Sequence, residues 1–544
     1  MFALSNNFGG LLNRPEPHLI GPNRAQSLSN VQLYAGSIKA QQGPGTPVYT
    51  GPAGVYRSAY KFNGTWIASN NTTAYQYVEF QGKLIRVAAG GVAPQASTDG
   101  ITWYNLGITA PTAGPSTADS GIAGNPNGTY SYYVTFVSTL GGESGPSPAS
   151  SSVTVVSHSI NLTAIPVSTD PQVTKRNIYR TGGTVSAISL IATLADNVTT
   201  TLTDNVADVN VGAAIQSTTY APPPNLEWIA VAPYGSLFGG VGANVYYCQP
   251  ELPQAWPATN MIQFTENTVG GVPFGGSVFV LTISQGYMII GDTASGLSLR
   301  GIPAPYGCLA RDTIVNMGQG SSYINASAAG VFYLANEGVC IFNGFGTEIV
   351  SKDALADSTI GTPGAVSPVN ARAARFGDRY ILFVQSGTAF PNGGYLEWNK
   401  HIPGNWLMGT VTATATHYNR LDDKLYIAQG DNNMRQWEDP TTGAPLAGSY
   451  TTGAWIEQSV DIMKHWRQAA IAHSQSITAS ATVDGVVASP ALTLTQGAVV
   501  QRTRFRFPAG VRGREIYLTV SWLAGWTGRI VEILDNVERK ATQL

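Results

Sequence analysis

Residues 277–291, SVFVLTISQGYMIIG, give the clearest indication of the fold in this sequence. This stretch reads as an apolar strand, a glycine-containing turn and a second, aromatic-containing strand, which is typical of a β-hairpin. Units of the same kind begin at residues 236, 331, 379 and 424, so successive starts lie 41, 54, 48 and 45 residues apart. Recurrence at about 40–50 residues predicts the blades of a β-propeller, here about six to eight of them. An irregular protein of several β-sheets is the alternative.

The composition supports an all-β protein with large packed cores. Charged residues make up only 11% of the 544 residues, against roughly 25% in an average soluble protein. Hydrophobic residues make up 43% and aromatic residues 10%, which excludes wholesale disorder. The 30 basic and 32 acidic side chains give a net charge of −2, which is not the balance of a dedicated nucleic-acid binder.

Residues 112–222 interrupt the pattern of hairpins. They carry nine charged side chains and many Thr, Ser and Val in short alternating runs, which predicts a β-sandwich. The segment YSYYVTFVSTLGGESGPSP, residues 130–148, resembles a strand and loop of fibronectin-type-III or immunoglobulin-like modules. Hairpins expected at Asn63-Gly64 and Gln81-Gly82 precede the interruption, so the sandwich is predicted to be inserted into the propeller.

The remaining segments differ in character. The segment WIEQSVDIMKHWRQAAIAH, residues 455–473, fits a helix or two strands, and we favour strands because an alternating run with an Asp484-Gly485 turn follows. The expected division is an irregular N-terminal arm, the first part of the propeller, the inserted sandwich, the rest of the propeller and a C-terminal β region, over residues 1–54, 55–111, 112–222, 223–450 and 451–544.

No catalytic, cofactor or metal motif stands out, so we expect a protein that is not an enzyme and binds no cofactor. The three cysteines, Cys248, Cys308 and Cys340, are far apart and are interpreted as buried small hydrophobic residues. The closest histidines, His465 and His473, are eight residues apart and are interpreted as ordinary surface residues. The adjacent Asp422 and Asp423 are expected to face opposite ways and not to form an acid–base pair.

One segment, STDGITW from Ser97 to Trp103, resembles the Asp-box turn of sialidase-type propellers, with one residue fewer between Asp99 and Trp103. We interpret it as a β-turn with a packed tryptophan. A sialidase also needs a cluster of arginines. The three arginines in ARAARFGDRY, at positions 372, 375 and 379, are instead expected in a loop that enters a strand.

The C-terminal region is basic, with eight basic and four acidic side chains in the last 44 residues. In QRTRFRFP, the arginines alternate with Thr503, Phe505 and Phe507, so a strand places the arginines on one face and the aromatics on the other. We expect this face to contact a partner, with an ordinary solvated strand face as the alternative. The interface candidates are Arg502, Arg504, Arg506, Arg512 and Arg514.

Taken together, the opening NNFGGLLNRPEP, the interrupted propeller and the tail GVRGREIYLTV resemble the tail nozzle, or tail tubular protein B, family of short-tailed bacteriophages. The resemblance implies a virion tail protein, assembled in the host cytoplasm, that forms a homo-hexameric ring. The ring would dock to the portal-adaptor above and to tail fibre, spike or needle proteins below. Genomic DNA would pass through it without sequence-specific binding.

Two other functions stay open. The first is a glycan-binding or glycan-cleaving propeller that acts as a phage receptor-binding protein, and the second is an adhesin-like β protein. The N-terminus shows neither the basic nor the apolar segment of a signal peptide, which argues against the adhesin. The apolar run at 277–291 is too short and too polar to span a bilayer, so no direct membrane insertion is expected.

Overall fold

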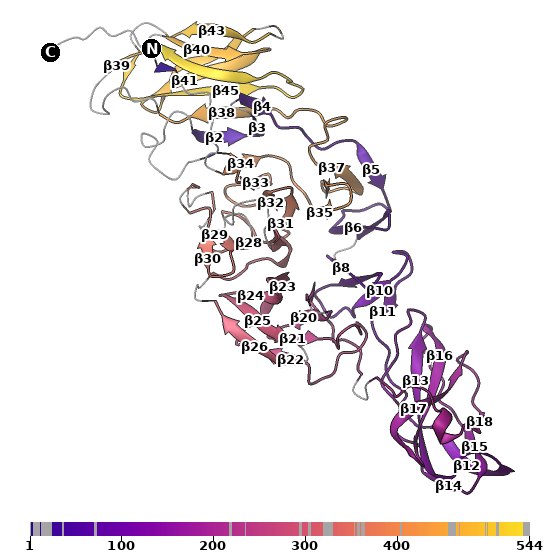
Figure 1. The fold of residues 1–544 in the computed structure, drawn as a ribbon. Helices are drawn as coiled ribbons and strands as arrows, with labels where there is room; N and C mark the ends of the chain where they lie inside the picture. The colour runs from indigo at the N-terminus through magenta and orange to yellow at the C-terminus, as the bar shows by residue number, and fades with distance from the viewer. Residues whose placement is uncertain are drawn as a thin grey trace.

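The computed structural model describes most of the chain. The residues described are 2–3, 11, 24–34, 37–69, 73–216, 220–233, 235–292, 296–302, 306–318, 330–352, 354–355, 359–360, 365–402, 405–454, 464–466, 468–495, 497, 499–507 and 511–536. Within these ranges the chain forms strands and two short 3₁₀ turns, η2 (Asp208–Asn210) and η3 (Arg311–Thr313), with no α-helix. None of the described segments is a helix long and apolar enough to cross a membrane. Three β bodies follow one another in space: a C-terminal sandwich, a propeller and an inserted sandwich (Figure 1).

The propeller contains six four-stranded antiparallel sheets. The first three are β8 (Gln76–Phe80), β9 (Lys83–Val87), β10 (Gln95–Ser97), β11 (Tyr104–Asn105); β19 (Trp228–Val231), β20 (Leu237–Val241), β21 (Asn244–Tyr247), β22 (Met261–Gln263); and β23 (Thr268–Phe274), β24 (Ser277–Thr282), β25 (Gly286–Asp292), β26 (Gly296–Gly301). The others are β27 (Val315–Asn316), β28 (Val331–Ala335), β29 (Gly338–Phe342), β30 (Thr347–Ile349); β31 (Arg372–Phe376), β32 (Arg379–Val384), β33 (Gly394–Asn399), β34 (Trp406–Gly409); and β35 (Ala415–Asn419), β36 (Lys424–Ala428), β37 (Asn433–Gln436), β5 (Pro47–Thr50).

A two-stranded hairpin, β6 (Ser58–Phe62) and β7 (Thr65–Ser69), completes the ring. The first strand of each sheet contacts the first strand of the next, from β8 through β19, β23, β27 and β31 to β35, and β35 contacts β6. Phe62 and Ile67 of the hairpin pack against Leu84 of β9, which joins the hairpin to the first sheet. The predicted propeller is therefore confirmed, with six full blades and one short blade.

The recurring hairpins seen in the sequence are the second and third strands of five blades. The unit that begins at residue 277 forms β24 and β25, and the units at 236, 331, 379 and 424 form the corresponding pairs in their blades. These two strands are the apolar middle of each sheet, which explains why they dominate the pattern. The short blade turns at Asn63 (φ 47°) and Gly64 (φ 83°), the left-handed pair that a type I′ turn requires.

The last blade is closed by a strand from the N-terminal region. β5 supplies its outer strand, with Tyr49 opposite Met434 and Thr50 opposite Asn433. The Tyr49 ring stacks on those of Tyr56 and Trp66, which ties this strand to the short blade. Closure by the start of the chain holds the ring together without a covalent link.

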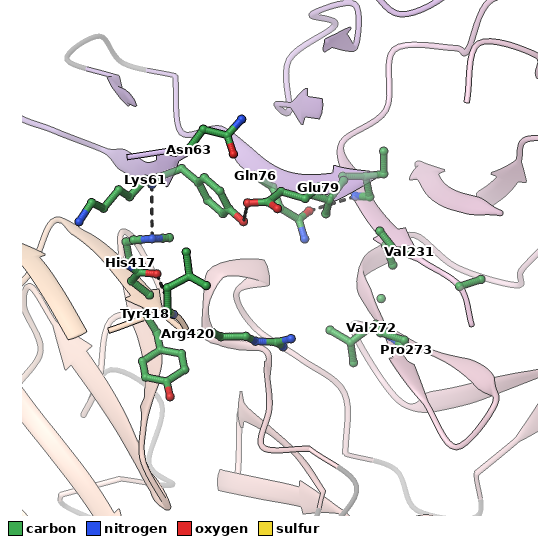
Figure 2. Close-up of a pocket in the computed structure, with 18 of the residues that line it drawn as sticks. Lys61, Asn63, Gln76, Glu79, Val231, Val272, Pro273, His417, Tyr418 and Arg420 are labelled. Atoms are coloured by element: carbon green, nitrogen blue, oxygen red, sulfur yellow. Dashed lines mark hydrogen bonds between the residues drawn. The ribbon is translucent and has the colours of Figure 1, made fainter. Parts of the chain in front are cut away.

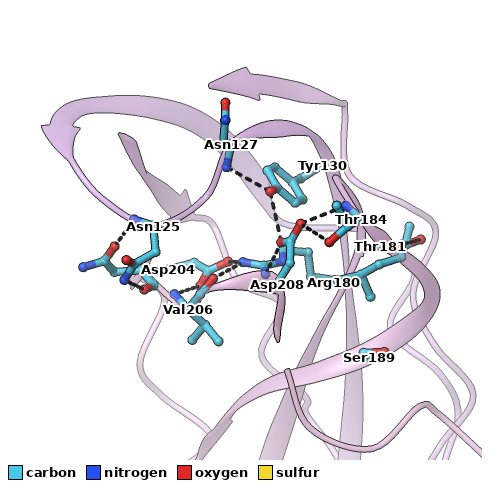
Figure 3. A network of polar contacts seen from close by, with 12 residues as sticks. Asn125, Asn127, Tyr130, Arg180, Thr181, Thr184, Ser189, Asp204, Val206 and Asp208 are labelled. Atoms are coloured by element: carbon cyan, nitrogen blue, oxygen red, sulfur yellow. Dashed lines mark hydrogen bonds and ion pairs between the residues drawn. The ribbon is translucent and has the colours of Figure 1, made fainter. Parts of the chain in front are cut away.

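The inserted sandwich leaves the propeller after β11 and returns before β19. One sheet contains β12 (Ser116–Ala123), β15 (His158–Thr163) and β18 (Leu202–Asp204), and the other contains β14 (Val153–Val155), β13 (Gly128–Ser138), β16 (Val173–Gly182) and β17 (Val185–Leu194). Their inward-facing side chains form a separate core around Tyr132, Val134 and Ile178. A buried polar network is centred on Arg180, which binds Asp204 and Asp208 (Figure 3).

The C-terminal sandwich combines strands from the N-terminal and the C-terminal regions of the chain. One sheet runs β3 (Val31–Tyr34), β4 (Ser37–Ala40), β46 (Ile530–Asn536), β40 (Gln468–His473), β43 (Gln501–Arg506), with β1 (Phe2–Ala3) on β46. The other runs β2 (Ala25–Ser29), β38 (Gly448–Thr452), β45 (Ile516–Trp522), β41 (Ile477–Val483), β42 (Val486–Leu494), and β39 (Lys464–His465) pairs with β44 (Arg512–Gly513).

The expectation of an irregular arm over residues 1–54 is therefore wrong from residue 25 onward. β2, β3 and β4 belong to the C-terminal sandwich and β5 belongs to the propeller. β2 pairs with β38 and β5 pairs with β37, both about 400 residues further along the chain, so no local pattern predicts these pairings. β3 and β4 pair with each other, and β4 joins the sandwich through β46. In the C-terminal region, residues 455–463 lie outside the described residues, while β39 and β40 confirm strands for the described part of 455–473.

Candidate functional site

A cavity of about 1110 Å³ opens at one end of the propeller's central channel (Figure 2). It lies where the innermost strands end and turn outward, between the short blade, three full blades and the turn after β35. Most of its wall comes from Tyr60, Lys61, Gln76, Val78, Glu79, Ile229, Val231, Val272, Pro273, His417, Tyr418, Asn419, Arg420 and Asp422.

Hydrogen bonds across neighbouring blades hold the polar side of the cavity in place. The Tyr60 hydroxyl donates to Glu79 Oε1 at 2.9 Å, which links β6 to β8. The backbone N–H of Ile229 donates to Gln76 Oε1 at 3.0 Å, which links β19 to β8. These bonds fix the separation of three inner strands and so the width of the cavity.

His417 is the buried part of this wall and belongs to an aromatic cluster. Its ring lies 4.6 Å from the Tyr60 ring and 5.7 Å from the Trp66 ring, between centroids. Its Nε2 accepts the backbone N–H of Lys61 at 3.3 Å. Burial lowers the pKa of His417 to about 4, so the ring is neutral at physiological pH.

The turn after β35 projects Arg420 into the cavity (Figure 2). Two tyrosines brace it: Tyr418 donates to Asp423 Oδ1 at 2.5 Å and Tyr426 donates to Asp422 Oδ2 at 2.7 Å. The two aspartates thus have different partners, and they do not form an acid–base pair, as the sequence predicts.

The opposite end of the channel is bridged by Arg311 of η3. Its guanidinium donates to the backbone oxygens of Glu227, at 2.7 Å, and Ala74, at 3.1 Å, which precede two inner strands. It also pairs with Asp312, which pairs in turn with Arg372. Burial opposes ionisation of Asp312, but the guanidinium groups of Arg311 and Arg372 hold the pKa of Asp312 below its usual range. A second cavity, of about 670 Å³, lies at this end.

The three arginines of ARAARFGDRY do not converge. Arg372 and Arg375 lie on β31, a strand rather than the expected loop, and Arg379 begins β32. The Arg379 guanidinium binds Glu438 at 2.6 Å and the fully buried Glu397 at 3.3 Å. Burial and the nearby Glu438 raise the pKa of Glu397, although Arg379 opposes this shift. The cluster that a sialidase needs is therefore not built from these residues.

The STDGITW segment forms a turn between β10 and β11. The Asp99 carboxylate accepts the backbone N–H groups of Ile101 and Thr102, both at 2.8 Å, and these bonds lower its pKa. The Arg86 guanidinium lies over the Trp103 ring, 3.9 Å from its centroid. The interpretation as a β-turn with a packed tryptophan is confirmed.

Cys248, Cys308 and Cys340 are buried and unpaired, as predicted, and burial raises the pKa of each thiol. The prediction for His473 is wrong, because its ring is fully buried between Thr503 Oγ1 and the backbone oxygen of Gln475. The side chain of His465 lies outside the described residues. In the part of the chain that the structure covers, no three His, Cys, Asp or Glu side chains gather as a metal site.

The basic interface candidates lie on the C-terminal sandwich. Arg502, Arg504 and Arg506 are exposed on one face of β43, which among the described strands lies at the edge of its sheet and pairs with β40. Thr503 faces the opposite way, and Phe507, just beyond the strand, is buried. Arg512 on β44 and Arg514 are also exposed, but they lie on a separate segment next to Asp484.

No family model matches this chain, and no curated protein matches it. Solved structures give only faint likenesses. The extracellular domain of BT4673 from B. thetaiotaomicron has 9% identity and a TM-score of 0.29, over 73% of this chain and 39% of that one. The Pan2 WD40 domain of Neurospora crassa has 8% identity and a TM-score of 0.26, over 52% of this chain and 86% of that one.

A third likeness is to the exo-β-1,3-galactanase of Phanerochaete chrysosporium, with 9% identity and a TM-score of 0.19, over 89% of this chain and 100% of that one. Likenesses of this size assign neither a family nor an activity. The site therefore rests on its own geometry. Sequence reasoning missed Tyr60, Glu79, His417 and Arg420, which come from three different blades and meet only when the ring closes.

Proposed function

We propose that this chain is a structural subunit of a phage tail, in the ring through which DNA leaves the head of a short-tailed virus. The observation that supports this is the layout of the subunit, a central propeller with a sandwich at each end (Figure 1). Such a subunit has separate surfaces for its neighbours in a closed ring and for the components above and below. A surface with few charges suits wide contacts between copies.

In this proposal the DNA passes between subunits and not through a propeller. Arg311 bridges one end of the propeller's own channel by binding two backbone oxygens and Asp312. A net charge of −2 also suits a conduit, because many Lys and Arg contacts to phosphates would hold the DNA tightly. The inserted sandwich then lies on the outside of the ring, away from the passage.

We further propose that the subunit has no catalytic activity. Two carboxylates on the wall of the large cavity are engaged, Glu79 by Tyr60 and Asp422 by Tyr426 and Lys61. Screening against capsular polysaccharide, sialosides and peptidoglycan is expected to give no turnover. Hydrolysis that disappears in a folded Asp99→Ala or Arg375→Ala variant would overturn this part of the proposal.

Fractionation of virus particles tests the tail assignment. The chain should co-purify with virions at about six copies per tail, and imaging should place it as a ring between the portal-adaptor and the fibre, spike or needle proteins. Copy numbers in multiples of three other than six would favour the receptor-binding alternative. A trimeric or pentameric ring at this position, or absence from the particle, would contradict the proposal.

A further inference from the structure

We propose that the large cavity of the propeller binds a saccharide that carries a carboxylate, and that Arg420 binds this carboxylate. The inference concerns residues within one subunit, so it does not depend on the tail assignment. At about 1110 Å³, the cavity lies at the upper end of the volumes of small-molecule sites. A cavity of this volume therefore suits an oligosaccharide better than a single small ion.

The wall of the cavity has two chemically different sides. Val231, Val272 and Pro273 make an apolar surface on the side of β19 and β23. Glu79 on β8 and Arg420 in the turn after β35 line the opposite side (Figure 2). Tyr60 on β6, which donates to Glu79, belongs to the same side. A sugar ring matches this division, because it has a face of C–H groups and an edge of hydroxyls.

The polar side also suits hydroxyl groups in detail. The amide groups of Asn63, Gln76 and Asn419 offer N–H donors, and the Glu79 carboxylate offers acceptors. A sugar hydroxyl donates one hydrogen bond and accepts others, so it can pair with either kind of group. The Tyr60 ring adds an aromatic surface next to them.

Arg420 makes the site selective for an acidic sugar. Four charged side chains line the cavity, and their charges sum to zero. Lys61 pairs with Asp422 at 3.7 Å, and Glu79 accepts the Tyr60 hydroxyl. No hydrogen bond or ion pair joins Arg420 to any residue that the structure describes. Its planar guanidinium is therefore available for a bidentate contact with a carboxylate.

The turn that carries Arg420 is fixed before a ligand arrives. The side chain of Asn419 accepts the backbone N–H of Leu421 at 3.1 Å, and the two tyrosine–aspartate bonds hold the rest of the turn. A turn held in this way loses little backbone entropy on binding. A single available guanidinium beside two carboxylates does not suit nucleic acid, which requires several phosphate contacts.

Titration calorimetry of the full chain tests this proposal. The probes are trigalacturonate and sialyllactose, with the neutral α-1,4-linked galactose trimer as the matched control. At least one acidic probe should bind, and the neutral trimer should bind at least about tenfold more weakly, a difference of about 1.4 kcal/mol. Arg420→Gln should weaken binding of the acidic probe by a similar factor, and Arg420→Lys should restore part of it.

The variants can be checked for folding in the same samples. Arg420→Gln removes no hydrogen bond or ion pair between described residues, so the melting temperature should change little. Arg512→Gln, on the C-terminal sandwich, should bind like the original chain. The proposal is overturned if neither acidic probe binds at about 1 mM, if neutral and acidic trimers bind equally, or if Arg420→Gln binds as well as the original chain.

Discussion

Arg180 and Asp204 form an ion pair in which neither side chain has any exposed surface. The guanidinium nitrogen and Asp204 Oδ2 lie 2.6 Å apart. Asp204 also accepts the Tyr132 hydroxyl at 2.8 Å, and Asp208 binds the same guanidinium at 2.9 Å. Arg180 belongs to one sheet of the inserted sandwich and Asp204 to the other, so the pair joins the two sheets through their shared core (Figure 3).

Replacing Arg180 with Met should strongly destabilise the inserted sandwich. The change leaves Asp204 buried without its cation, and breaking a buried pair in this way costs about 3–5 kcal/mol. Hydrogen exchange on the full chain should show faster exchange across β13, β16 and β18 and little change in the propeller. Lys175→Met, at an exposed position of the same strand, is the control and should stay within about 0.5 kcal/mol. Equal effects of the two changes would refute this prediction.

Stability of the propeller should fall as the pH falls from about 6.5 to about 4. Burial lowers the pKa of His417 to about 4, so in this window the unfolded chain takes up a proton that the folded chain excludes. Above about pH 6.5 both states are neutral and this effect disappears. The difference of roughly 2.5 pKa units corresponds to about 3 kcal/mol.

Calorimetric melting of the original chain and of His417→Phe at about pH 7 and about pH 4 measures this effect. Between these two pH values, the free energy of unfolding of the propeller should fall by about 3 kcal/mol more in the original chain than in the variant. His401→Gln, at a position that is 63% exposed, is the control and should melt like the original chain at each pH. An unchanged acid sensitivity in His417→Phe would contradict the assignment.

Removing the Tyr49 ring should weaken closure of the propeller. Tyr49 lies on β5 and stacks on Tyr56 and Trp66, so Tyr49→Ala should destabilise the propeller by about 1–3 kcal/mol. The neighbouring Val48 is 48% exposed, and Val48→Ala should change stability by less than about 0.5 kcal/mol. Thermal melting of both variants compares them. Similar melting temperatures would show that β5 does not close the ring by this contact.

Reversing the three exposed arginines of β43 to Glu should impair ring assembly and leave the subunit folded. Arg502, Arg504 and Arg506 lie on the outer face of an edge strand, away from the core that contains Ile471. Opposite charge at these positions should repel an acidic partner surface. Native mass spectrometry and particle reconstitution measure assembly, and circular dichroism measures folding. Normal assembly of the triple variant would exclude this face as an interface.

The blades could be predicted because their middle strands are apolar and recur at a nearly regular spacing. The unit at 277–291 is buried along nearly all of β24, and a short glycine-containing turn joins β24 to β25. One short stretch of sequence is therefore enough to predict a β-hairpin. The outer strands are different. β11 has two residues and β5 is mostly exposed, so neither has an apolar pattern that marks it as a strand.

The cavity could not be predicted for a related reason. Tyr60 and Arg420 are 360 residues apart in the sequence, and the turn RLDD around Arg420 looks like any exposed polar turn. His473 was mistaken for a surface residue because the sequence does not show that Thr503 on β43 would cover its ring. For the cavity the deciding neighbour comes from another blade, and for His473 it comes from a paired strand that is 30 residues away in the sequence.

The pairing of β5 with β37 has a consequence for how the protein is made. Thr50 and Asn433 are 383 residues apart, so β5 leaves the ribosome long before its partner exists. At about 5–20 residues per second, that interval lasts roughly 20–75 s. The inserted sandwich, with partners no more than about 90 residues apart, can fold within it. The propeller must wait for its final blade, and until then β5 is an unpaired strand that a chaperone or another nascent chain could bind.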